Sequence, residues 1–160
     1  MKGLIIIATL STLILLGAFS PAFATHPVPF NGRMSGSGTA TSQTTNSIVA
    51  TVHLQHFGKS RLVGTTTVTG TSACGGFVGT EVDTITASNG DKILVSGDGV
   101  SCPVSANPIM FQDNVTFTIT GGTGRFEHAS GSGVVHTAIT ITSPSGDSTF
   151  SASITGTITY

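Results

Sequence analysis

The sequence predicts an all-β protein in which eight antiparallel strands form an up-and-down barrel. Three observations lead to this fold class: a composition rich in Thr, Ser and Gly, repeated alternation of apolar and polar residues, and short turn sequences between the alternating segments. Thr, Val, Ile and Phe suit a pleated sheet, whereas Thr, Ser and Gly are poor helix formers. Closing the sheet into a barrel removes its exposed edges. A β-sandwich with long crossover connections is the alternative.

The first 24 residues predict a secretory signal peptide. Met1 and Lys2 precede an apolar run over 4–18, and Ala22-Phe23-Ala24 has the small-x-small pattern of a cleavage site. The apolar run is too short for a comfortable membrane span. We therefore expect cleavage after Ala24, a secreted or periplasmic location, no membrane span after removal of the signal, and a single domain over 25–160.

The composition of the remaining 136 residues excludes one large class of function. They contain 25 Thr, 17 Ser and 19 Gly, and their 5 Lys and Arg residues face 7 Asp and Glu residues, a formal charge of −2. A protein that binds nucleic acid through its phosphates needs a basic surface. No nucleic-acid partner is expected.

The strands follow from strict alternation, which the last segment shows best. Phe150, Ile154 and Ile158 fall on one face, while Thr and Ser occupy the intervening positions. This pattern is typical of a half-buried strand. Strands are expected at 30–40, 47–57, 60–70, 76–88, 92–99, 110–120, 131–142 and 149–160.

The connections between these segments are mostly short. Asn89-Gly90 lies between two alternating segments and predicts a type I′ hairpin, in which both residues have positive φ. Two connections are expected to be longer: 99–109, which contains two prolines, and 121–130.

The two cysteines are expected to form a disulfide. In an up-and-down barrel, Cys74 lies in the connection between strands three and four and Cys102 in that between strands five and six, so both lie at one end. Disulfides persist in secreted proteins. A reactive cysteine pair is the alternative, but no basic residue lies nearby in sequence to lower a thiol pKa.

A glycine-rich run over 120–133 is the most distinctive local feature. A phosphate-binding loop of this kind would open a long helix, but another Thr-rich strand follows at once. Phe126 and Ala129 are three residues apart, so a single helical turn is expected to lay Phe126 over the barrel mouth as a plug.

This run also carries a family resemblance. Gly-Gly-Thr-Gly-Arg-Phe over 121–126, followed by Ala-x-Gly over 129–131 and preceded by the Asn89-Gly90-Asp91 hairpin, resembles the signature of small secreted bacterial proteins with an allene oxide cyclase-like barrel. These proteins are similar in turn to plant dirigent proteins. The resemblance covers about Phe30 to Tyr160. It implies a calycin-like eight-stranded barrel that binds a hydrophobic small molecule or steers its cyclisation or coupling. No residue here matches the catalytic acidic residues of either family by motif, so their roles are not transferred.

Two acidic residues form the first candidate site. Glu81 and Asp83 lie two apart on one predicted strand, so they share a face, with their Cα atoms roughly 7 Å apart. If they face the interior, burial would raise a pKa and make a general acid. If Val78 and Val82 face inward instead, both carboxylates lie in water. The second arrangement is favoured because unpaired charges are costly to bury.

Asp113 is a further candidate because it shares a face with Phe111 and Phe117. It could lie near the open end of its strand, pair with Arg125 or Arg61, or provide a polar point within a cavity. Structural pairing is favoured.

The histidines do not predict a metal site. His53 and His56 are three apart on a strand and point to opposite faces. No Gly-x-Ser-x-Gly sequence is present to anchor a hydrolase triad. No metal and no cofactor are expected.

The favoured function is binding of a small hydrophobic ligand within the barrel. An eight-stranded barrel has room for one small ligand at most. The first alternative is a cyclase or dirigent-type stereochemical guide that uses the cavity, and the second is a structural or surface-interaction protein with a solid barrel. An outer-membrane barrel is disfavoured because the aromatic girdles of such barrels are missing. The candidate ligand-binding residues are Phe111, Phe117, Phe126 and Arg125. The candidate catalytic residues are Glu81, Asp83 and Asp113.

Overall fold

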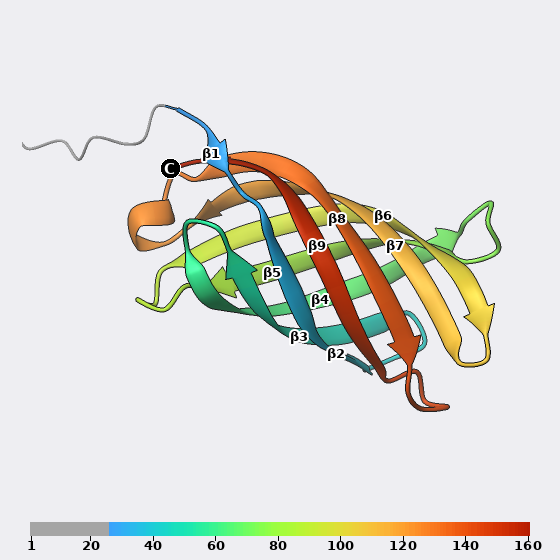
Figure 1. Ribbon diagram of the computed structural model, residues 1–160. Helices are drawn as coiled ribbons and strands as arrows, with labels where there is room; N and C mark the ends of the chain where they lie inside the picture. The colour runs from blue at the N-terminus through green and yellow to red at the C-terminus, as the bar shows by residue number, and fades with distance from the viewer. Residues whose placement is uncertain (1–25) are drawn as a thin grey trace, which may run out of the picture.

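The computed structural model describes residues 26–160, which form a closed eight-stranded antiparallel barrel with one short extra strand (Figure 1). The predicted signal peptide lies outside the described residues. Apart from one short 3₁₀ turn, η1, the described elements are all strands. Their bounds are β1 Val28–Pro29, β2 Gly32–Ala40, β3 Thr45–Leu54, β4 Gly58–Thr71, β5 Phe77–Thr86, β6 Lys92–Ala106, β7 Ile109–Gly122, η1 Gly124–Phe126, β8 Ser130–Ile141 and β9 Ser148–Thr159.

The strand order confirms the predicted barrel. From β2 to β9 every strand pairs antiparallel with the next one in the chain, and β9 also pairs with β2 to close the sheet. The sandwich alternative is therefore wrong. Strand β1 was not predicted; it pairs with Thr157 and Ile158 of β9, beyond the residues that pair with β2.

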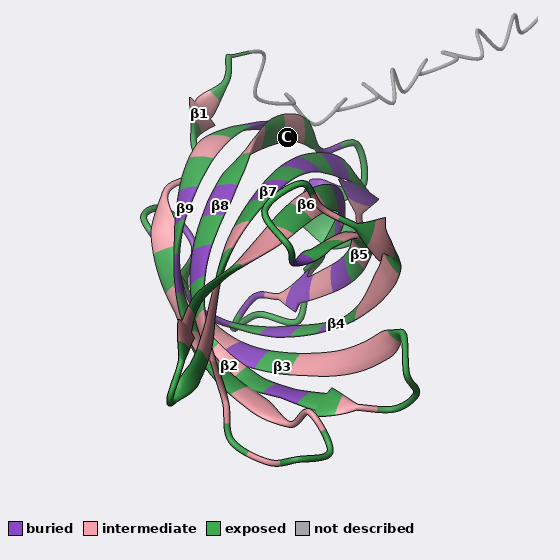
Figure 2. Cartoon of the chain, turned by 90° about the vertical axis from the view of Figure 1, so that its right-hand side faces the viewer, coloured by how far each residue is buried: buried purple, intermediate pink, exposed green. Residues whose placement is uncertain are grey.

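The connections fall at two ends of the barrel, as Figure 1 shows. The segments 41–44, 72–76, 107–108 and 142–147 lie at one end, called the open end here. At the other, the closed end, lie the remaining connections and the C-terminus. Along the strands, buried and exposed residues alternate (Figure 2), because successive side chains point into the barrel and out of it.

The predicted long connection over 99–109 is wrong. Strand β6 continues to Ala106, and only Asn107 and Pro108 join it to β7. Proline has no N–H to donate to a sheet, so it normally interrupts a strand. Here Pro103 lies at an irregularity where the β6–β7 register shifts between Pro103 and Ser105, and the strand continues past it.

The predicted type I′ turn at Asn89-Gly90 is also wrong. Gly90 has a φ of +90°, but no residue other than glycine has a positive φ among those described. The Gly90 N–H donates to the Ala87 carbonyl at 3.0 Å. The Asp91 N–H donates to the side-chain oxygen of Asn89 at 3.2 Å, and this bond stabilises Asn89 without a left-handed backbone.

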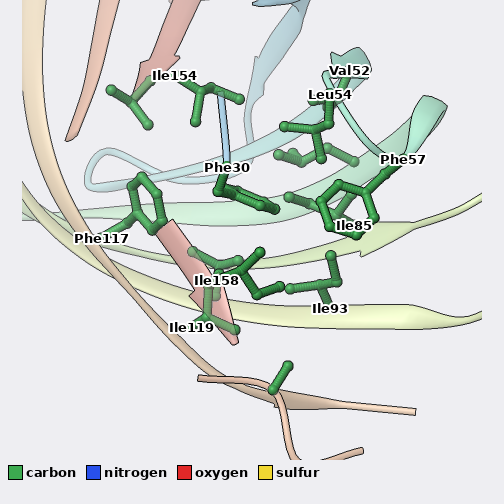
Figure 3. Packing of buried hydrophobic residues seen from close by; sticks show 14 of the residues in the cluster. Phe30, Val52, Leu54, Phe57, Ile85, Ile93, Phe117, Ile119, Ile154 and Ile158 are labelled. Carbon is green, nitrogen blue, oxygen red and sulfur yellow. The ribbon is translucent and has the colours of Figure 1, made fainter. Parts of the chain in front are cut away.

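The closed end is filled by aromatic side chains. The Phe126 ring lies 5.4 Å from that of Phe57 and 5.1 Å from that of Tyr160, measured between centroids. Phe30 lies 5.9 Å from Phe57 and 5.8 Å from Phe117. Figure 3 shows these phenylalanines other than Phe126 converging with isoleucines from opposite strands. Half of the barrel is therefore packed solid.

The predicted disulfide is confirmed. Cys74, in the 72–76 connection, is bonded to Cys102 of β6, with a Cα–Cα distance of 5.6 Å. The bond lies at the open end and ties that connection to the barrel wall. Within residues 26–160, no helix is long and apolar enough to cross a membrane.

Candidate functional site

The open half of the barrel encloses a cavity of about 360 Å³. It exists because several inward positions on its wall are glycine or alanine, among them Gly38 and Ala40 of β2 and Gly99 of β6. Larger apolar side chains form the rest of the wall. They are Ile48, Val68, Phe77, Phe111, Val115, Ile139, Ile141 and Phe150.

Two phenylalanines mark the mouth of the cavity. The rings of Phe77 and Phe111 lie 5.9 Å apart, and Phe77 is 43% exposed although it shares the inward face of β5. The connections 41–44 and 142–147 contribute polar and small residues to the same rim. An apolar molecule can therefore meet aromatic surface at the entrance.

The interior of this half also holds three carboxyl groups. Glu81 and Asp113 line the cavity, and Asp83, one inward position further along β5, is only 6% exposed. The favoured prediction that Glu81 and Asp83 face solvent is wrong. The side chain that points outward is Val82, which is 67% exposed.

Glycines on the neighbouring strands make room for these acids. Gly64 of β4 pairs with Asp83, and a Cβ atom at Gly64 would clash with the Asp83 carboxyl. Gly97 of β6 pairs with Glu81, and a Cβ atom there would lie 3.2 Å from Glu81 Oε1. The acids occupy space that side chains on β4 and β6 would otherwise fill.

Burial keeps these carboxyls protonated to unusually high pH. It raises the pKa of Glu81 to about 7, with a further contribution from the negative charge of Asp113. Burial, followed by the charge of Glu81, raises the pKa of Asp83 to about 8. The pKa of Asp113 is also raised by burial, although a hydrogen bond from Ser101 opposes the rise. Oδ1 of Asp83 and Oδ1 of Asp113 have no hydrogen-bond partner.

No basic side chain compensates for the three acids. Every Lys, Arg and His in the described range 26–160 is exposed. The predicted pairing of Asp113 with an arginine is wrong: Arg125 lies at the closed end with its Nε 3.8 Å from Asp91 Oδ2, and Arg61 is exposed on β4. Asp113 is instead the polar point within a cavity that was the remaining alternative.

The structure separates the four candidate ligand-binding residues. Phe111 lines the cavity, whereas Phe117 and Phe126 are 2% and 0% exposed within the packed core. The predicted helical turn at Phe126 is confirmed as η1, which lays this ring across the closed end. The guanidinium of Arg125 lies 4.6 Å from the Phe126 ring centroid and 5.6 Å from that of Phe57, on the outside of the plug.

Sequence reasoning missed most of the cavity wall. Ile48, Ile139 and Phe150 had been placed on strands but not in a site, and Phe77 had not been singled out. Their signal was present in the alternation, because each shares the inward parity of its strand. What was missing was the strand register, which decides whether inward residues meet in the packed half or in the hollow half.

The described residues contain no group of three or more His, Cys, Asp and Glu side chains arranged to hold a metal ion. Comparison of the chain with family models, curated proteins and solved structures returns no match. The function is therefore inferred from the cavity itself.

Proposed function

We propose that this protein binds a small, largely apolar molecule in the cavity at the open end of the barrel. The observation that carries the proposal is the contrast between the two halves of the interior, one packed with aromatic rings and the other enclosing about 360 Å³. Ligand sites in proteins commonly have volumes of roughly 300 to 1,000 Å³, mostly apolar walls and a few polar groups. The cavity has all three features.

The wall divides the expected ligand into two parts. An apolar or aromatic body would pack against Phe77, Phe111 and Phe150, where burial of each square ångström of apolar surface is worth about 25 cal/mol. A polar group would lie against Glu81 and Asp113, the carboxyls that line the cavity. Those two contacts would orient the molecule.

A fluorescence titration with N-phenyl-1-naphthylamine tests the proposal. We expect saturable binding to the wild-type protein and at least a tenfold weaker affinity for Ile48→Trp, whose larger side chain would occupy the cavity. The matched control is Val49→Trp on the same strand, because Val49 points outward and is 40% exposed. Absence of saturable binding to the wild type, or equal binding by both variants, would contradict the proposal.

A second candidate function is a cyclase or stereochemical guide that uses the same cavity, as the resemblance to allene oxide cyclase-like barrels implies. The observation in its favour is the pKa of about 7 for Glu81 beside apolar walls, which suits a general acid at neutral pH. Its test is chemical conversion of a bound ligand, followed by mass spectrometry and chiral chromatography. Conversion by the wild type that is lost in Glu81→Gln, with binding retained, would support it; unchanged ligand would refute it.

A further inference from the structure

The charges of this protein are sorted between the inside and the outside of the barrel. Of the seven acidic residues, three project into the interior: Glu81, Asp83 and Asp113. Every basic side chain in the described part of the chain is exposed. The cavity therefore presents acids to a ligand and offers it no cation.

The surroundings of Glu81 show the same imbalance from every side. Its own strand contributes Asp83, and β7 contributes Asp113. The inward residues next to it are uncharged: Gly64 and Thr66 from β4, Val95, Gly97 and Gly99 from β6, and Val115 from β7. No described group of opposite charge faces this carboxyl.

Two of the acids also have oxygens that lack a partner. Asp83 is 6% exposed and its Oδ1 accepts no hydrogen bond, and the same is true of the buried Oδ1 of Asp113. Buried polar atoms in folded proteins are nearly always hydrogen-bonded. A primary ammonium group has three N–H donors and a positive charge, so it matches a set of carboxyl oxygens better than a hydroxyl with one donor.

The geometry points to an amphiphilic amine as the ligand, with its ammonium group between Glu81 and Asp113 and its apolar body against the phenylalanines of the mouth. This inference rests on the proposed function and names the chemical class of its ligand. The aromatic faces of Phe77 and Phe111 favour the same charge, because a cation is attracted to the face of an aromatic ring.

Proton release should accompany binding of such a ligand. In the empty cavity, burial holds Glu81 protonated up to about pH 7. An ammonium group stabilises the ionised carboxylate, so the amine binds as the proton leaves. The affinity for an amine should therefore rise between pH 5 and pH 8. An alkylamine, like a lysine side chain with its pKa of about 10.4, stays charged over this range.

Three probes with the same alkyl chain separate charge from hydrophobicity: octylamine, 1-octanol and octanoate. Each is measured by displacement of N-phenyl-1-naphthylamine from the disulfide-bonded protein at pH 5, 6, 7 and 8. At pH 8 we expect octylamine to bind at least tenfold more tightly than 1-octanol, and octanoate to bind most weakly. The octylamine affinity should increase at least tenfold from pH 5 to pH 8, while the 1-octanol affinity stays constant.

Substitutions of the cavity acids locate the effect. Glu81→Gln and Asp113→Asn should each remove most of the preference for octylamine over 1-octanol, and the second variant carries the test if the first does not fold. Asp98→Asn is the control, because Asp98 is an exposed acid on β6 and should leave the preference unchanged. Equal affinities for octylamine and 1-octanol at pH 8 would overturn the inference and leave the proposed function standing. Binding of none of the three probes, together with no binding of the fluorophore, would overturn both.

Discussion

Raising the pH from 5 to 7 is expected to destabilise the folded barrel, because Glu81 and Asp83 are buried without a basic partner. Their ordinary pKa values are 4.5 and 3.8, and in the folded state these pKa values rise to about 7 and about 8. Between these limits the folded protein keeps protons that the unfolded chain has lost. The stabilisation is complete below the ordinary pKa values and is lost as the pH rises through the folded ones.

The size of the effect follows from the number of retained protons. Each carboxyl that stays protonated only in the folded state lowers the free energy of unfolding by about 1.4 kcal/mol for every pH unit. From pH 5 to pH 7, Glu81 alone would then lower it by about 2 to 3 kcal/mol, and Asp83 would lower it by a similar amount. Small domains have unfolding free energies of about 5 to 15 kcal/mol, so the change is large enough to measure.

Urea denaturation of the disulfide-bonded protein at pH 5, 6, 7 and 8 provides the assay. The wild type should lose stability steadily from pH 5 to pH 7. Glu81→Gln should reduce this slope by about 1.4 kcal/mol per pH unit, since glutamine does not titrate. Asp98→Asn, the exposed control, should keep the wild-type slope. An unfolding free energy that stays constant or increases from pH 5 to pH 7 would refute the reasoning.

Three further predictions concern packing and covalent structure. Phe126→Ala should lower the free energy of unfolding by about 3 to 5 kcal/mol in urea denaturation, because the ring is fully buried in the closed end; a loss below 1 kcal/mol would contradict its role as a plug. Gly64→Ala should cost about 1 to 3 kcal/mol through its clash with the Asp83 carboxyl, and in a double-mutant cycle Asp83→Ala should relieve part of that cost, whereas additive losses would argue against the contact. Replacing Cys74 and Cys102 with alanine should lower stability by about 3 to 4 kcal/mol on the loop-entropy estimate for a 28-residue separation, and an unchanged denaturation midpoint would contradict this.

The strands could be predicted because alternation is a local property. Each inward stripe, such as Phe150, Ile154 and Ile158, shows in sequence without knowledge of its neighbours. Phe126 was also predictable as a plug, since its spacing to Ala129 requires only one turn. Pro103 misled the prediction of the fifth strand, because only the register of β6 with β7 shows that the proline lies at an irregularity.

The orientation of the acids could not be predicted in the same way. On β5, the alternation of Val78 and Val82 with Glu81 and Asp83 fits either face equally well. The decision depends on Gly64 and other glycines on adjacent strands, which leave room for carboxyls inside the barrel. Those glycines are far from β5 residues in the pattern that periodicity detects, and they become neighbours only when the register is known.

The most direct test of an open-end ligand site is the crystal structure of the protein in complex with N-phenyl-1-naphthylamine. We expect electron density for the fluorophore inside the barrel, in contact with Phe111, Ile139 and Phe150, with the aromatic plug at the closed end unchanged. A fluorophore bound only to the outer surface, or side chains that fill the open half of the barrel, would contradict this site.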